Sequence, residues 1–280
     1  MIFYFTGTGN SQYAAQKLAS DGEDVVSVVE CLRKDSYSFQ LQENEAVGLV
    51  FPVYFGGLPI AVRQFIERLR LSQKPAYLYG VMTCGGSLAG AGAMLRERLG
   101  EAGYRLDASY AVQMPDSYMV MFPAPTEKEE TKLLARAELD LERIRSKIVC
   151  RDRVFAGMSL PGRAVTAVMY PQYLRGRKTA PFHTNDSCIR CGVCAGRCPS
   201  RAISMETGSP TWVKERCTFC MSCARCGAIE YGDKLTGKVR YKHPMLRKKG
   251  GHGGGGHDHS APSSSAGGHC ASGEGAHHHG

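Results

Sequence analysis

The feature that most restricts the fold of this chain is a pair of closely spaced cysteine repeats. The first, CIRCGVCAGRCP (188–199), has the spacing C-x2-C-x2-C-x3-C-P. The second, CTFCMSCARCG (217–227), repeats the first three cysteines at the same spacing, 29 residues downstream. In a chain for which we expect no export, cysteines this close together indicate a metal ion or a metal cluster more than disulfides.

The spacing of the cysteines distinguishes a zinc site from an iron–sulfur cluster. Structural zinc sites use two C-x2-C pairs with a longer loop between them. Three thiolates in C-x2-C-x2-C instead surround one [4Fe–4S] cluster, and the cysteine of the following C-P points to a second cluster. The repeats therefore predict iron–sulfur ligation. The candidate ligands are Cys188, Cys191, Cys194, Cys198, Cys217, Cys220, Cys223 and Cys226.

The first 150 residues alternate between strand and helix patterns. Short apolar runs predict strands, and amphipathic segments between them predict helices. Strands are expected over 1–5, 24–29, 46–55, 76–84 and 109–114, and helices over 10–20, 60–70, 91–103 and 126–149. This alternation predicts an α/β doubly wound parallel sheet.

A glycine-rich loop, FTGTGNS (5–11), follows the first strand and opens the first helix. Backbone N–H groups, hydroxyls and the helix N-terminus make such a loop an anion site. No Gly-Lys-Ser/Thr follows, and Gln12 stands where a dinucleotide-binding loop has its third glycine. A loop of neutral donors suits a phosphate monoester.

This loop resembles the phosphate loop of flavodoxin-like proteins, which hold FMN. FPVYFGGLP (51–59) and TCGGSLAGAG (83–92) resemble the other two flavin loops of that family. The resemblance implies the strand order 2-1-3-4-5, with FMN at the end of the third strand, and Tyr54 or Phe55 stacking on the flavin ring. The implied FMN-binding residues are Thr6, Gly7, Thr8, Gly9, Asn10, Ser11, Pro52, Val53, Tyr54, Phe55, Gly56, Thr83, Cys84, Gly85 and Gly86.

Two features near the expected flavin leave alternatives. Cys84 is interpreted as a small core residue and not a nucleophile. No Ser/His/Asp array or paired carboxylate site is evident either, so no catalytic residue is predicted. MPDSY (114–118), after the fifth strand, either leans on the flavin or turns the chain.

The order of these segments resembles the flavodoxin–ferredoxin fusion proteins found mostly in anaerobes. It implies a flavodoxin-like FMN domain (1–150), a connector (151–180) with one short helix, and a small α+β two-[4Fe–4S] ferredoxin domain (181–245). Residues 246–280 are rich in Gly and His, and we expect them to be disordered.

If ligation follows that family, Cys226 completes the cluster of the first repeat and Cys198 completes that of the second. However, Cys226 follows Cys223 by two residues instead of three, and Gly227 replaces the proline. In an α-helix one residue fewer rotates a side chain by about 100°. Either Cys226 completes the first cluster from a shifted position, or that cluster is labile and takes a three-iron form.

The formal charge of +9 is unevenly distributed. Residues 1–149 hold 16 Lys and Arg against 18 Asp and Glu, whereas residues 150–249 hold 19 against 6. Two bound clusters, each of charge about −2, offset part of this excess. We therefore expect no nucleic-acid binding, and we expect protein redox partners with an acidic face. No run is long and apolar enough to span a bilayer, and the expected compartment is the cytoplasm.

These observations favour an electron carrier that uses FMN and two [4Fe–4S] clusters. The alternative is a flavin-dependent reductase of a small molecule, fed through the ferredoxin domain. A third interpretation, a zinc-bound regulatory or nucleic-acid module, requires a protein without visible absorption. The pattern indicates neither the donor, the acceptor nor the oligomeric state.

Overall fold

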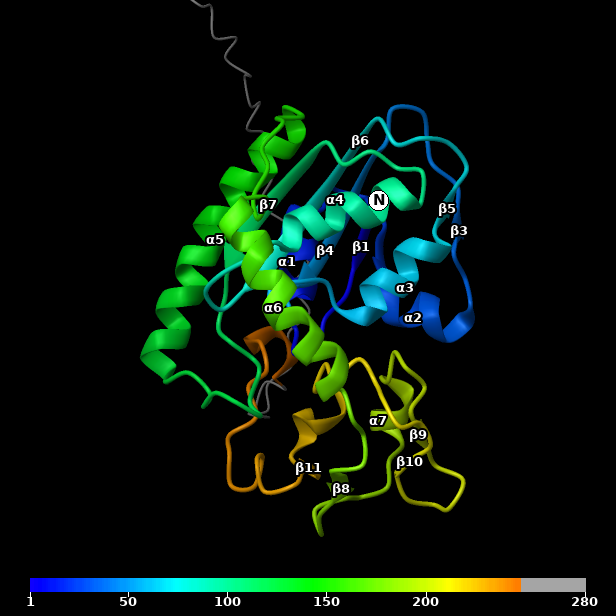
Figure 1. Cartoon of the computed structure of the whole chain (residues 1–280), viewed down its shortest axis with the longest axis vertical. Coiled ribbons are helices and arrows are strands. Elements are labelled where there is room, and N and C mark those ends of the chain that lie inside the picture. Colours follow the sequence, from blue (N-terminus) through cyan, green and yellow to red (C-terminus); the bar gives the residue numbers. More distant parts are fainter. Residues whose placement is uncertain (248–280) are drawn as a thin grey trace, which may run out of the picture.

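The computed structural model describes residues 1–247 and contains one five-stranded parallel sheet (Figure 1). Its order is β2-β1-β4-β6-β7, and every neighbouring pair is parallel. The strands are β1 (Ile2–Tyr4), β2 (Val25–Ser27), β4 (Ala46–Pro52), β6 (Tyr77–Cys84) and β7 (Ala108–Gln113). Counted in chain order this is 2-1-3-4-5, so the predicted fold class is confirmed.

Helices cover both faces of the sheet. On one face, α1 (Asn10–Leu18) and α5 (Glu127–Val149) bury apolar side chains against β1, β4, β6 and β7. On the other face lie α2 (Val28–Lys34), α3 (Ile60–Arg68) and α4 (Ala91–Glu101). A separate two-stranded parallel pair, β3 (Ser38–Phe39) with β5 (Arg70–Leu71), lies beside this face. The central strands are buried on both faces, which explains their continuous apolar runs.

The segment after the second strand differs from the prediction. The expected strand over 24–29 ends at Ser27, and α2 begins at Val28. The two valines at 28 and 29 favour a strand by their β-branched side chains. Ser27 instead caps a helix by accepting a hydrogen bond from the Glu30 N–H. Capping and burial of Val28 and Leu32 override the local preference.

The cysteine-rich region folds into short elements below the sheet in Figure 1. Two antiparallel pairs form it: β8 (Phe182–Thr184) with β11 (Ile229–Tyr231), and β9 (Ile203–Ser204) with β10 (Thr211–Trp212). Each repeat continues into one short helical turn, α7 (Val193–Gly196) or the 3-10 turn η1 (Cys223–Cys226). A second 3-10 turn, η2 (Pro244–Leu246), follows. These elements match the predicted small α+β unit.

Residues 151–180 contain a longer helix than expected. Helix α6 (Leu160–Gly176) has 17 residues, is capped by Ser159 and contains Pro171 in its interior. Figure 1 shows α6 running from the sheet domain down to the cysteine-rich region. Its buried Tyr170 and Tyr173 share a core with Phe182, Phe219 and Tyr231. This segment therefore joins the two parts through a common core.

Two expectations concern the remaining chain. The predicted disorder covers residues 246–280. Leu246 ends η2 and Arg247 pairs with Glu130, so these two residues belong to the fold, and residues 248–280 lie outside the described residues. Within residues 1–247, no helix is both long and apolar enough to cross a membrane.

Candidate functional site

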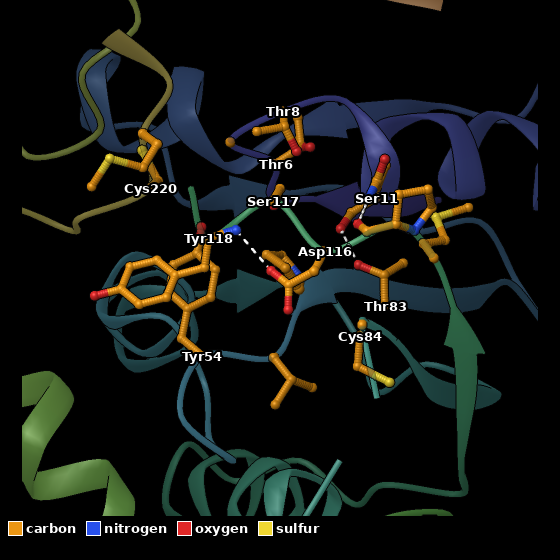
Figure 2. A pocket seen from close by; sticks show the side chains of 18 of the residues that line it. Thr6, Thr8, Ser11, Tyr54, Thr83, Cys84, Asp116, Ser117, Tyr118 and Cys220 are labelled. Carbon is orange, nitrogen blue, oxygen red and sulfur yellow. Dashed lines mark hydrogen bonds between the residues drawn. The ribbon is translucent and has the colours of Figure 1, made fainter. Parts of the chain in front are cut away.

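A pocket of about 190 Å³ lies at the carboxyl ends of β1, β4 and β6. It is lined by most of the residues that the flavodoxin resemblance implies for FMN (Figure 2). These are Thr6, Gly7, Thr8, Asn10, Ser11, Pro52, Val53, Tyr54, Phe55, Thr83, Cys84 and Gly85. Three predicted glycines, Gly9, Gly56 and Gly86, are not among the lining residues.

The phosphate loop is held in shape by its own side chains. The Gly9 N–H donates to Thr6 Oγ1 at 2.9 Å, and Gly9 has a φ of 108°, which only glycine adopts without strain. Ser11 Oγ and Thr83 Oγ1 lie 2.8 Å apart and join the first and third loops. Asn10 Nδ2 donates to the Pro115 carbonyl at 2.9 Å, so this amide fixes the loop. This bond positions the loop and leaves the second N–H of the amide as a donor.

The pocket is chemically suited to FMN. Asp116 is the only charged residue among the described residues that line it. Hydroxyls and backbone N–H groups of the loop can bind an anion at the N-terminus of α1, and Thr6, Thr8 and Ser11 lie on one side of the pocket in Figure 2. Aromatic and apolar side chains supply the remaining wall. This division into a neutral polar end and an apolar end fits a phosphate attached to a planar ring.

The second flavin loop presents Tyr54 to the pocket. Tyr54 and Gly57 exchange two backbone hydrogen bonds, which fold residues 54–57 into a tight turn. Phe55 and Gly56 both have a positive φ in this turn. The Tyr54 ring lies edge-on to Tyr173 with centroids 5.7 Å apart. Burial raises the pKa of the Tyr54 hydroxyl well above its ordinary value, so this ring stays neutral beside the ligand.

The third loop places a thiol near a carboxyl group. Burial, followed by the charge of Asp116, raises the pKa of Cys84 to about 11. A thiol with that pKa is protonated at neutral pH and is a poor nucleophile. This agrees with the interpretation of Cys84 as a packing residue.

Several lining residues were not among the predicted binding set. MPDSY (114–118) lines the pocket, which favours the first of its two alternatives, and Met121 and Phe122 continue that wall. Met169 and Tyr173 come from α6, and Phe219, Cys220 and Met221 come from the second cysteine repeat. The sequence carries no local signal for these last five residues, because they reach the pocket only through tertiary packing.

Helix α6 braces the pocket from outside. Thr166 Oγ1 donates to the Gly56 carbonyl at 2.6 Å and accepts from the Gly90 N–H at 2.8 Å. Further along the helix, the Tyr173 hydroxyl donates to the Thr218 carbonyl at 2.8 Å in the second cysteine repeat. One helix therefore positions two flavin loops and the cysteine-rich region together.

The two cysteine repeats have the same backbone conformation. In the first, Arg190 (φ 55°) and Gly192 (φ 71°) are left-handed; in the second, Phe219 (φ 60°) and Met221 (φ 58°) occupy the equivalent positions. Alternating left-handed residues turn successive N–H groups inward and form an anion-binding nest, a feature of iron–sulfur sites. A left-handed conformation is costly for Phe and Met, and such strain accompanies function. Both loops therefore fit a cluster.

The cysteines gather into two groups. We name Cys198, Cys217, Cys220 and Cys223 the second thiol group; all four line one small cavity and interact electrostatically. Cys188, Cys194 and Cys226 also interact electrostatically and, with Cys191 of the same loop, form the first thiol group. Each group combines three cysteines of one repeat with one of the other. Within residues 1–247, no cluster of His, Cys, Asp and Glu has the arrangement of a single-ion site.

The structure offers a reason why the altered spacing of Cys226 does not separate it from the first group. The prediction of a 100° displacement assumed an α-helix. Cys226 instead ends the 3-10 turn η1, in which residues three apart lie on the same side. Gly227 ends the turn with a φ of 87°. A tighter turn thus offsets the missing residue, and Cys226 lies near Cys194.

The pocket and the second thiol group are in direct contact. A Cβ atom built on Gly7 would lie 2.0 Å from the Cys220 carbonyl oxygen, so glycine is required for this approach. Cys220 also lines the pocket and the cavity between the second group's sulfurs. In Figure 2 it enters from the cysteine-rich region.

Two arginines hold the cysteine-rich region against α2. Arg33 Nη1 donates to the Ala195 carbonyl at 2.8 Å. In the reverse direction, Arg201 Nη2 donates to the Leu32 carbonyl at 2.9 Å and pairs with Asp35. The carbonyls at the end of a short helix favour such cations.

The segment 241–247 returns to the phosphate loop. The Tyr241 hydroxyl donates to Asn10 Oδ1 at 2.7 Å, and the His243 N–H donates to the Thr8 carbonyl at 2.9 Å. The His243 ring stacks on Tyr13 with centroids 4.3 Å apart, so it packs against α1. The C-terminal end of the cysteine-rich region therefore supports the FMN loop from behind.

His243 makes stability depend on pH. Burial, followed by the positive charge of Arg247, lowers the pKa of His243 from 6.5 to about 4. The unfolded chain takes up the proton first, so stability falls as the pH drops from about 6.5 toward 4.

When the pH falls from 7.5 to 5.5, we expect His243 to lower the free energy of unfolding by about 1.4 kcal/mol. Urea unfolding at both pH values should show a smaller loss in His243→Phe, which keeps the stack. Equal losses in both proteins would contradict this account.

Comparisons with known proteins match both halves of the chain. Residues 1–94 match the family model described as a flavodoxin domain, and residues 181–204 match that of a 4Fe-4S binding domain. No curated protein gave a significant match.

Several solved structures resemble the sheet domain. A putative flavoprotein from Bacteroides uniformis is 15% identical over 48% of this chain and 96% of its own, with a TM-score of 0.32. The Trp repressor binding protein from Bacillus subtilis is 12% identical over 51% and 99%, with a TM-score of 0.31. Rubredoxin oxygen:oxidoreductase from Desulfovibrio gigas is 19% identical over 52% and 36%, with a TM-score of 0.28. Because these scores are low, the fold assignment depends on the strand order and the family match.

Proposed function

Because a flavodoxin domain and a 4Fe-4S binding domain lie in this one chain, we propose that it transfers electrons between FMN and two [4Fe–4S] clusters, and exchanges them with protein redox partners. The flavodoxin domain implies FMN, and the 4Fe-4S binding domain implies an iron–sulfur cluster. FMN exchanges one or two electrons, whereas each cluster exchanges one.

The observation that carries this proposal is the contact between Gly7 and Cys220. The same cysteine lines the FMN pocket and belongs to the second thiol group. The second group is therefore the one adjacent to the flavin. Hydrogen bonds from α6 hold the second repeat in place. Those that Arg33 and Arg201 make between α2 and the cysteine-rich region keep the two parts in fixed contact. Electron exchange between the two parts then requires no domain movement.

The proposal of a second cluster has separate support. The family match covers only the first repeat, but the second repeats its left-handed positions and gathers four thiols around one cavity. Burial raises the pKa values of Cys217 and Cys220 to about 12. Thiols with such pKa values become thiolate ligands only when a metal displaces the protons.

Arg225 supplies charge between the two groups. It is 9% exposed, and within residues 1–247 no carboxylate is among its electrostatic partners. Its electrostatic neighbours are Arg197 and the cysteines 220, 223 and 226. A buried guanidinium needs a negative partner, and thiolate-bound clusters provide one. Arg225 therefore favours electron uptake by the nearby clusters.

Replacing Arg225 should lower the reduction potential of these clusters. In Arg225→Gln the loss of one buried positive charge is expected to disfavour reduction about tenfold, or about 59 mV. A redox titration followed by low-temperature EPR measures this change. Arg225→Lys, which keeps the charge, should lie close to the unaltered protein. An unchanged potential in Arg225→Gln would refute the assignment.

Cofactor analysis of anaerobically purified protein tests the proposed function. We expect about eight iron and eight sulfide per chain and one FMN. Zinc in a colourless protein without flavin would contradict it. About four iron would show that only one thiol group holds a cluster.

A reductase of a small molecule is the second candidate. Met121, Phe122 and Met169 line the pocket and are 59%, 46% and 40% exposed. This apolar opening offers a place for a small apolar acceptor. Turnover of such an acceptor at the same rate in Met121→Glu would count against this candidate.

A further inference from the structure

The two thiol groups differ in their access to solvent. In the first group, Cys191 and Cys226 are exposed, whereas Cys198 in the second group is only 8% exposed. The loop of the second group lines the FMN pocket, and its Phe219 and Met221 are buried in the common core. A protein that approaches from solvent therefore reaches the first group more closely.

Two large apolar side chains in the loop that carries Cys191 are exposed. Ile189 is 84% exposed and Val193 is 45% exposed, and both lie in the loop that carries Cys188, Cys191 and Cys194. Ile189 follows Cys188 directly, so it is held beside the site by the ligand loop itself. Exposed apolar residues grouped at a functional centre indicate an interaction surface.

The charges around these side chains are mainly positive. Arg190 and Arg197 are exposed, and Arg197 interacts electrostatically with Arg225 beside Cys226. Arg201 is engaged by α2 and is not available. Over residues 183–201 the only acidic residue is Asp186, which is also exposed. We name the surface of Ile189, Arg190, Val193 and Arg197 the first-group face.

We propose that the first-group face is the docking site for an acidic electron-transfer protein. The proposal rests on the proposed function and adds the place of exchange and the kind of partner. Ile189 and Val193 exclude water at the centre of the contact, while Arg190 and Arg197 attract a carboxylate-rich partner. Because opposite charges increase association rates most at low salt, the exchange should slow as ionic strength rises.

An acidic [2Fe–2S] ferredoxin, reduced beforehand, is the probe. Freeze-quench EPR, in which the signals of reduced [2Fe–2S] and [4Fe–4S] clusters differ, gives the second-order rate of reduction of this chain's clusters without reference to FMN. Reversing two charges in Arg190→Glu/Arg197→Glu should lower that rate at least about tenfold at low salt and weaken its salt dependence. Ile189→Ser should weaken equilibrium binding of the oxidised ferredoxin several-fold. Arg145→Glu is the control for charge reversal, because Arg145 is exposed and belongs to α5, a helix that lies far from α7 in Figure 1.

The outcomes separate this proposal from the proposed function. Rates within twofold of the unaltered protein in the double variant, or an equal loss in Arg145→Glu, would overturn the docking site. The unaltered protein and Arg145→Glu could bind a DNA duplex tightly while the double variant does not. That result would also overturn the docking site, because the face would then be a nucleic-acid site. Iron content and reduction by dithionite must be unchanged in each variant; a loss of either would assign these residues to cluster assembly and overturn their docking role. Failure of the reduced clusters to reduce FMN would contradict the proposed function alone.

Discussion

Gly7→Ala is expected to separate the FMN pocket from the second thiol group. The added Cβ would lie 2.0 Å from the Cys220 carbonyl oxygen and 3.1 Å from its carbon. Both are backbone atoms, so no side-chain rotation relieves the clash. Overpacking of this kind costs about 3 kcal/mol, at the upper end of the usual range. We expect the melting temperature to fall by about 6–12 °C and FMN binding to weaken with it.

Thermal unfolding and FMN fluorescence titration measure these effects. Gly100→Ala in α4 is the matched control, because nothing lies within 4 Å of its added Cβ. That substitution should be neutral or slightly stabilising. If Gly7→Ala melted like the control and bound FMN equally well, the two parts would not be in the contact that the structure shows.

Cys198→Ser is expected to remove the cluster next to the flavin while the first cluster stays. Cys198 lies in the first repeat but lines the cavity of the second thiol group. Its sulfur accepts a hydrogen bond from the Ala202 N–H at 3.3 Å, which fixes it toward that cavity. A hydroxyl is a poor ligand for this cluster because iron–sulfur sites favour thiolates. Iron should fall from about eight to about four per chain.

The functional consequence should be larger than the loss of iron. FMN binding is expected to persist, but electrons that enter at the first group should reach FMN at least about a hundred times more slowly, since the adjacent site is empty. Iron analysis and stopped-flow reduction of the flavin measure both effects. Cys84→Ser, in the FMN pocket, should leave the iron content unchanged. Loss of the first cluster in Cys198→Ser would contradict the grouping of the thiols.

Local patterns were sufficient to predict the sheet and much of the pocket. The strands of the sheet are buried apolar runs, and the loops at their carboxyl ends meet at one edge because the strands are parallel. Thr6, Tyr54 and Cys84 could therefore be assigned to one pocket before any contact was known. The cysteine spacing likewise indicated two loops with one conformation.

Other features depended on contacts between distant segments. Helix α2 forms although Val28 and Val29 favour a strand, because it is capped and buried. The wall made by Met169, Tyr173 and Cys220 arises from packing of α6 and the second repeat on the sheet domain. The position of Cys226 required knowledge that its turn is 3-10 and not α-helical. None of these choices is determined by the residues of the segment alone.

An anaerobic reductive titration tests the central claim most directly. Flavin absorbance and low-temperature EPR would be recorded on the same samples at each step. The account predicts about four electrons per chain, two taken up with loss of flavin absorbance and one with each of two [4Fe–4S] signals. Uptake of about two electrons with no cluster signal, or of none by a colourless protein, would contradict it.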